Sequence, residues 1–182
     1  MTQTESKYQA YLSDFESLAA DGGTHDAGWV RDLRERSLAR FSDLGLPTVR
    51  RGNEKWKYTS IARIANTAFR YPSKNDPTGI RPADIKDAAP WQDGWVNLVF
   101  VNGQYSQALS SRPADTNGVR IANLAEAVVS DRPELERHLA HYASTEDDGF
   151  TALNTAFLRD GAYVHIPEGE SMDSPINIIF VS

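Results

Sequence analysis

The sequence predicts an α+β fold, with helices in the N-terminal part and short strands toward the C-terminal end. Two amphipathic stretches near the N-terminus, a hairpin signal in the middle and two apolar segments after residue 160 lead to this prediction. The 182 residues are 40% hydrophobic and 24% charged, which is ordinary for a folded soluble protein. The length allows one domain or a domain and a fraction.

Helical spacing identifies the first two elements. Apolar residues recur at this spacing over 8–19, and a second helix is expected from about residue 29 to 44. Residues 21–23, Asp-Gly-Gly, should end the first helix, and Gly45 sits where a C-terminal cap of the second belongs. The first apolar stripe contains Tyr8, Tyr11, Leu12, Phe15, Leu18 and Ala19, and the second contains Val30, Leu33, Phe41 and Leu44.

The next part of the sequence predicts short elements between loops. Thr59 is expected to cap a short helix that carries Ile61 and Ile64. Alternation over 67–71 predicts a strand. Four prolines make 72–94 mostly loop.

The strongest hairpin signal lies in the middle of the chain. Residues 95–101 have the pattern of a buried strand, and Asn102-Gly103 tolerates the positive φ angles of a type I′ turn before a second strand over 104–109. Another Asn-Gly pair, at 117–118, precedes a short strand over 119–121.

Further helices are expected between these strands and the C-terminal segment. Asn123 and Glu126 have the spacing of a capping box that opens a helix through Val129. Pro133 fits the first turn of the next helix. That helix should present Leu135, Leu139 and Tyr142 on one face, and a last short helix carries Phe150, Leu153 and Phe157.

The character of the chain changes at Asp160-Gly161. Two strands, over 162–166 and 176–181, are separated by turn residues, which suggests a barrel, a sandwich or the coils of a β-helix. The last strand is apolar and has nothing after it to pair with, although two strands alone are marginal and an open edge invites association. We therefore expect the front part of a longer protein, with self-association through this edge.

Charge and composition exclude several classes of function. A net charge of −6 disfavours binding to nucleic acid, and the absence of cysteine excludes disulfides, thiolate metal sites and a cysteine nucleophile within this chain. The N-terminus lacks the apolar region of a signal peptide, and the longest apolar run, 98–101, is too short to span a membrane. We expect a cytoplasmic protein with no membrane partner.

The charged and aromatic segment 54–58 is the candidate docking site. Glu54, Trp56, Lys57 and Tyr58 could form a partner-docking patch, because aromatic residues beside cations are typical of interfaces. The preferred alternative is that Trp56 and Tyr58 anchor the segment to the core while the lysines stay solvated. Binding of a single-stranded nucleic acid is the weakest interpretation.

Two other groups of residues are candidates for a metal site and for a catalytic site. His138 and His141 are three apart on a predicted helix and could hold a metal, but no third ligand has a defined spacing. Asp160 with Asp173 or Glu168 could imitate the carboxylate pair of a glycosidase, although acids are expected in turns. His165 should lie on a strand surface. We assign no catalytic, cofactor-binding or metal-binding residue.

Several segments, in this order, resemble the SufB/SufD family of iron–sulfur cluster assembly proteins. The absence of cysteine favours the SufD branch. The segments are Gly-Leu-Pro-Thr at 45–48, Glu-Lys-Trp-Lys-Tyr-Thr at 54–59, Asn-Leu-Ala-Glu-Ala at 123–127, Phe-Thr-Ala-Leu-Asn-Thr-Ala-Phe at 150–157, Asp-Gly at 160–161, Ile-Pro-Glu-Gly at 166–169 and Pro-Ile at 175–176.

The resemblance implies a fold and a function. It implies a helical N-terminal domain with a small β-hairpin over 1–148, and over 149–182 the first coils of a truncated right-handed parallel β-helix. It implies a non-enzymatic scaffold subunit that pairs with SufB and engages the ATPase SufC. An iron–sulfur cluster is implied only for the full complex, with no cofactor in this chain. The competing hypotheses are a fragment of a β-helix carbohydrate-active enzyme and a stand-alone interaction domain.

Overall fold

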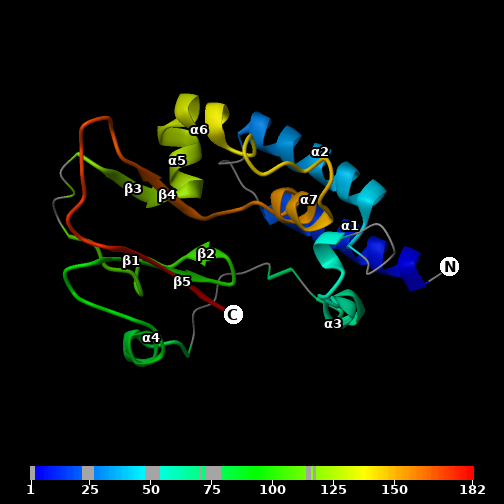
Figure 1. Cartoon of the computed structure of the whole chain (residues 1–182), viewed down its shortest axis with the longest axis horizontal. Helices are drawn as coiled ribbons and strands as arrows, with labels where there is room; N and C mark the ends of the chain where they lie inside the picture. Colours follow the sequence, from blue (N-terminus) through cyan, green and yellow to red (C-terminus); the bar gives the residue numbers. More distant parts are fainter. Residues whose placement is uncertain are drawn as a thin grey trace. The chain divides into compact units, whose positions relative to one another are not determined.

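The computed structural model describes residues 3–21, 27–47, 54–69, 71–72, 79–113, 116 and 118–182. Its helices and strands, labelled in Figure 1, confirm an α+β protein. The chain forms two compact units of two stretches each, Met1–Ser73 with Pro133–Leu158 and Lys74–Arg132 with Arg159–Ser182. The sequence predicted a different division, into 1–148 and 149–182. That boundary marks the expected start of a β-helix core, and it stays a prediction.

The first unit is built from helices. α1 (Gln3–Asp21) and α2 (Gly28–Leu44) confirm the two predicted N-terminal helices. Gly45 caps α2 as predicted, since its φ is +63° and its N–H donates to the carbonyl of Phe41 at 2.7 Å. The predicted stop at residues 22–23 and the side chain of Tyr8 lie outside the described part. The other elements are η2 (Glu54–Trp56), α3 (Ala62–Asn66), α6 (Arg132–His138) and α7 (Gly149–Ala156). The first residue of α6, Arg132, is the last residue of the stretch Lys74–Arg132 and so belongs to the second unit.

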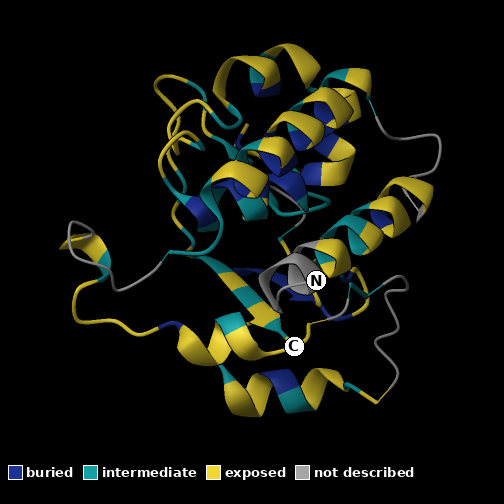
Figure 2. Cartoon of the chain, turned by 90° about the vertical axis from the view of Figure 1, so that its right-hand side faces the viewer, coloured by how far each residue is buried: buried dark blue, intermediate teal, exposed yellow. Residues whose placement is uncertain are grey.

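Aromatic side chains join the helices of this unit. Tyr11 of α1 meets Phe41 of α2 edge-on, with 5.4 Å between the ring centroids, and Phe15 of α1 meets Phe157 at 6.1 Å. α2 packs along α7, and Leu18 of α1 is fully buried. Buried and exposed residues alternate along the helices in Figure 2, as expected of amphipathic helices around a shared core.

The second unit is organised around β1 (Val96–Val101), all of which is buried. β1 pairs antiparallel with β2 (Gln104–Tyr105) and, on its other side, parallel with β5 (Ile176–Val181). β3 (Arg120–Asn123) and β4 (Ala162–His165) form a separate antiparallel pair. The short helices are α4 (Pro82–Ala88) and α5 (Leu124–Ser130).

Both faces of β1 are covered. On one face, Leu98 and Phe100 belong to a core cluster with Ile121 of β3. On the other face, Val99 packs in a second cluster with Ile85 of α4. A strand that is buried on both faces has a continuous apolar sequence instead of an alternating one. This is why the sequence predicted β1 clearly.

The predicted hairpin is confirmed at Asn102-Gly103. Their φ angles are +48° and +78°, and Phe100 pairs with Tyr105 across the turn. The second strand ends at Tyr105, earlier than predicted, and Leu109 then turns into the core. At the second Asn-Gly pair, residue 117 lies outside the described part.

Two local predictions are wrong, and a third missed a short helix. Thr59 does not cap α3, because the cap residue is Ile61 and Ser60 Oγ accepts the N–H of Ala62 at 3.4 Å. The described residues of 67–71 form no strand. The described residues of 72–94 are mostly loop, as predicted, but they include the short helix α4, since proline suits the first position of a helix as well as a loop.

The C-terminal strand β5 pairs with β1 along its whole length, from Val96 beside Ile176 to Val101 beside Val181. We expected the last strand to have no strand to pair with. This is wrong for one edge of β5, because its partner, β1, lies earlier in the chain. The other edge pairs with no strand in the described part. β4 likewise pairs with an earlier strand, and a closed β-helix coil is not formed by these residues.

Candidate functional site

In the predicted docking segment, Trp56 and Tyr58 have opposite environments. The indole of Trp56 lies 5.4 Å from the ring of Phe150, at the start of α7, and is half-buried. Tyr58 is 91% exposed, with the ammonium of Lys57 5.4 Å from its ring centroid. The structure therefore places Trp56 as an anchor and leaves the ring of Tyr58 free to contact a partner.

The charged residues around these aromatics form ion pairs at the surface. Lys57 lies 3.5 Å from Glu54, and Lys55 lies 4.0 Å from Asp147 in the loop before α7. All four side chains are mostly exposed, so each pair contributes little to stability and can be exchanged for contacts with a partner.

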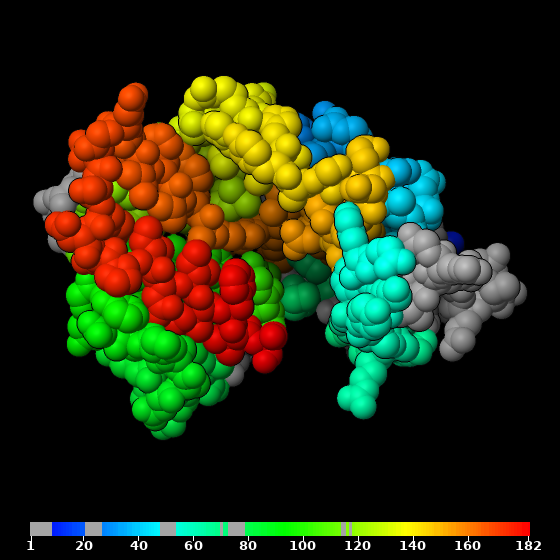
Figure 3. Space-filling view, in the orientation of Figure 1, coloured from blue at the N-terminus to red at the C-terminus, as the bar shows by residue number. Residues whose placement is uncertain are grey.

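Two more apolar side chains of the same segment are exposed. Ile64 of α3 and Phe69 are about half exposed, while Ile61 is buried. Figure 3 shows the atoms of this part of the chain, in teal, at the surface. Exposed apolar residues beside cations are typical of protein-binding surfaces. Sequence reasoning missed Ile64 and Phe69, because helical spacing alone does not tell which isoleucine of a short helix is covered.

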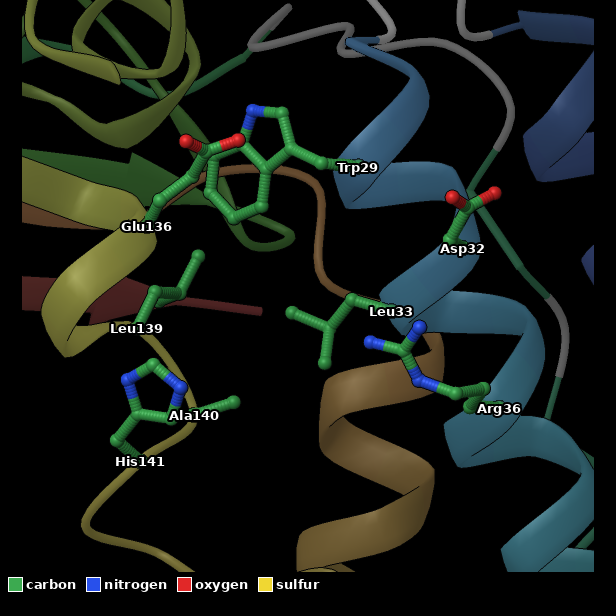
Figure 4. Close-up of a pocket in the computed structure, with 8 residues that line it drawn as sticks. All are labelled: Trp29, Asp32, Leu33, Arg36, Glu136, Leu139, Ala140 and His141. Carbon is green, nitrogen blue, oxygen red and sulfur yellow. The ribbon is translucent and has the colours of Figure 1, made fainter. Parts of the chain in front are cut away.

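A pocket of about 290 Å³ lies between α2 and residues 136–141 of the same unit (Figure 4). Leu33 and Leu139 supply apolar surface, and Asp32, Arg36 and Glu136 supply charges of both signs. Such a lining suits a polar group with donor and acceptor atoms better than an ion of either sign. The pocket could not be expected from sequence, since its two walls come from distant segments.

Trp29 contributes its indole to this pocket. Its Nε1 is buried without a hydrogen-bond partner in the described part of the chain. Figure 4 shows the Glu136 carboxylate beside the indole. Because the nitrogen is itself covered from solvent, the unused donor is not presented to a ligand entering the pocket.

The paired histidines have separate structural contacts. His138 lies between Glu134, 3.1 Å from its Nε2, and Tyr142, 2.6 Å from its Nδ1. His141 Nδ1 donates to the carbonyl of Arg137 at 2.6 Å. The described residues contain no cluster of three ligands that could hold a metal. Tyr142, predicted on the buried face with Leu135, is 80% exposed.

Asp160 has a structural role. Its carboxylate accepts the backbone N–H groups of Tyr105 at 2.9 Å, Ala125 at 3.1 Å and Gly161 at 2.9 Å. Asn123 Nδ2 donates to it at 3.2 Å. Because these hydrogen bonds use the acceptor positions of the carboxylate, they favour a structural role for Asp160 in the turn over a role in a glycosidase pair.

His165 takes part in a polar cluster on the β3–β4 sheet. Its Nδ1 lies 3.1 Å from Nη2 of Arg120, the residue opposite it in the register. Arg120 also pairs with Asp131 at 2.7 Å, and Tyr163 donates its hydroxyl to the same carboxylate. The bond from Tyr163, followed by the nearby charge of Arg120, lowers the pKa of Asp131 below its ordinary 3.8.

None of the helices described is long and apolar enough to cross a membrane.

Comparison with known proteins identifies the family. The model of the SufBD protein N-terminal region matches residues 4–178. The chain belongs to the SufBD family. Within it, the chain is 26% identical over 174 residues to the iron-sulfur cluster assembly SufBD family protein slr0076 of Synechocystis sp., covering 94% of this chain. It is 20% identical over 176 residues to the iron-sulfur cluster assembly protein SufD of Bacillus subtilis, covering 95%.

A third SufBD relative, ABCI9 of Arabidopsis thaliana, is 24% identical over 178 residues, covering 85% of this chain. The matches span 36% of the lengths of slr0076 and ABCI9 and 38% of that of SufD, so this chain corresponds to little more than a third of the curated relatives it matches. The resemblance drawn from the sequence motifs is thereby confirmed at the level of the SufBD N-terminal region.

Proposed function

We propose that this chain is the N-terminal region of a scaffold subunit for iron–sulfur cluster assembly. The supporting observation is the SufBD N-terminal match over residues 4–178. The relatives named above have cluster assembly in their names. The proposal places the protein in the cytoplasm, in the SufD branch, as a partner of SufB and of the ATPase SufC.

The proposed mechanism is structural and not enzymatic. The complete β-helix would hold the partner subunit, and ATP-driven movement of SufC would reshape their interface around the cluster, which is the cargo. The parallel, in-register pairing of β5 with β1 supports this proposal, because a parallel β-helix is built from ladders of that kind.

Within this region, we assign partner docking to the exposed side chains of the segment 54–69. Lys57 and Tyr58 would make the central contacts, with Ile64 and Phe69 extending the apolar surface. Trp56 would hold the segment in place through Phe150.

Co-purification tests the scaffold proposal. The full-length parent protein, expressed with SufB and SufC homologues of its organism, should elute as one complex in mild salt. Separate elution of all three proteins would contradict it.

A variant pair tests the docking segment separately. Tyr58→Ala in the full-length protein should weaken the complex by about 1–2 kcal/mol. Val129→Ala, at an exposed apolar residue of the other unit, is the control and should have no effect. An intact complex with Tyr58→Ala would remove this surface from the proposal and leave the scaffold role standing.

A further inference from the structure

A chain of hydrogen bonds joins Glu134, His138 and Tyr142 on the surface of the first unit. Nε2 of His138 lies 3.1 Å from Oε1 of Glu134, and Nδ1 lies 2.6 Å from the hydroxyl of Tyr142. The imidazole and phenol rings also stack, with 5.8 Å between centroids. Spacing of four residues puts the three side chains on one side of α6 and the turn after it.

The direction of these bonds follows from the carboxylate, which can only accept. In the neutral imidazole of His138, Nε2 therefore carries the hydrogen toward Glu134, and the lone pair of Nδ1 accepts the O–H of Tyr142. The other carboxylate oxygen of Glu134 is held by the guanidinium of Arg137. An acid, an imidazole and a hydroxyl in this order form the arrangement that activates oxygen nucleophiles.

The phenol is accessible to a reagent. Tyr142 is 80% exposed, and the carboxylate that orients the imidazole, on Glu134, is only 23% exposed. Tyr58 offers a matched comparison, because it is 91% exposed and no base bonds to its hydroxyl in the described residues. The two tyrosines are similar in access, and they differ in the base at Tyr142 and in the ammonium of Lys57, which lies 5.4 Å from the ring centroid of Tyr58.

We propose that Tyr142 is a base-activated acceptor for an acyl group from an activated acyl donor such as a thioester. The phenol oxygen attacks the carbonyl carbon while its proton passes to Nδ1 of His138, and Glu134 stabilises the imidazolium. The bond to the leaving group then breaks, and the leaving group takes the proton from His138. The products are an aryl ester and the protonated leaving group, with no change of oxidation state.

Acetylation by N-acetylimidazole of the full 182-residue chain, followed by peptide mass spectrometry, tests this proposal. Tyr142 should react about 5–10-fold faster than Tyr58. A positioned general base typically contributes about 10²–10⁴-fold, and we expect less here because bulk water is also an available base at an exposed site. His138→Gln should lower the rate at Tyr142 to that at Tyr58.

The variants make each outcome decisive. Glu134→Gln keeps the imidazole but removes the carboxylate, so the rate at Tyr142 should fall about two- to threefold, less than in His138→Gln. Circular dichroism checks that both variants are folded, and the rate at Tyr58 in the same sample is the internal reference. Equal rates at Tyr142 and Tyr58 in the unsubstituted chain overturn the proposal, as does a fast rate at Tyr142 that persists in His138→Gln.

Discussion

Asp160, just before β4, accepts the backbone N–H of Ala125 at 3.1 Å, at the start of α5. The same carboxylate accepts the N–H of Tyr105 in the hairpin and the amide of Asn123 at the end of β3. One side chain therefore joins three segments of the second unit. Asn123 is the N-cap residue of α5, as predicted, but its side chain makes no capping bond, and Asp160 accepts the N–H of Ala125 in its place.

Asp160→Ala should lower the free energy of unfolding by about 2 kcal/mol. The substitution leaves several partly buried donors without an acceptor, and each unsatisfied donor costs about 1–3 kcal/mol before water relieves it. Urea denaturation followed by fluorescence of the tryptophans measures the change. Asp173→Asn, an exposed turn acid, is the control and should stay within about 0.5 kcal/mol of the unsubstituted chain. Equal stabilities of the two variants would contradict this role.

Among the described glycines, Gly149, at the start of α7, has the least room for a side chain. A Cβ built on it would lie 1.9 Å from the carbonyl oxygen of Gly45, and backbone atoms cannot move aside cheaply. Gly149→Ala should therefore destabilise the unit by about 2–4 kcal/mol, through displacement of α7 from the end of α2. Gly28→Ala meets nothing within 4 Å and should be neutral or slightly stabilising. A neutral Gly149→Ala in thermal denaturation would show that the contact is not this close.

Substitution of Trp56 should destabilise the fold more than substitution of Tyr58. Trp56→Ala removes the packing against Phe150 and should cost about 1–2 kcal/mol, since the indole is only half-buried. Tyr58→Ala removes a ring that is almost fully solvated and should stay within about 0.5 kcal/mol. Chemical denaturation of both variants gives the comparison. A larger loss with Tyr58→Ala than with Trp56→Ala would reverse the assignment of anchor and contact residue.

The Asp131 cluster predicts a pH dependence. Because folding lowers the pKa of Asp131, the ionised carboxylate stabilises the fold at pH values above its unfolded pKa, and this contribution is lost as pH falls through the folded pKa. The stability difference between the unsubstituted chain and Asp131→Asn should be constant above about pH 5 and should shrink below about pH 4. Tyr163→Phe, which removes the hydroxyl donor, should weaken this dependence. A difference that grows in acid would contradict the sign.

The elements that the sequence predicted well are those whose signals are local. The hairpin at Asn102-Gly103 depends on two adjacent residues, and α2 depends on apolar spacing closed by Gly45. Asn123 was predicted at the N-cap of α5 and is found there. The bond from the N–H of Ala125 to Asp160 could not be predicted, because the two residues are 35 apart in the sequence. The same holds for the docking segment, where burial of Trp56 by Phe150 and exposure of Tyr58 are decided by tertiary packing.

The free edge of β5 predicts self-association of the 182-residue chain. Phe180 stacks on Phe100 with 5.2 Å between centroids, yet it is 67% exposed, and Ile178 on the same face is also exposed. An apolar edge strand with unpaired backbone groups favours pairing with a second copy. Light scattering after gel filtration should show a mass that rises with concentration.

Phe180→Lys should keep the chain monomeric, since a charge on an edge strand opposes pairing. Its stability should fall by no more than about 1 kcal/mol, because most of the ring is already in water. Val129→Lys places the same charge on α5, at a residue that is exposed and away from the edge, and should leave the association unchanged. A strictly monomeric unsubstituted chain at high concentration would contradict the prediction, and association that survives Phe180→Lys but not Val129→Lys would move the interface to α5.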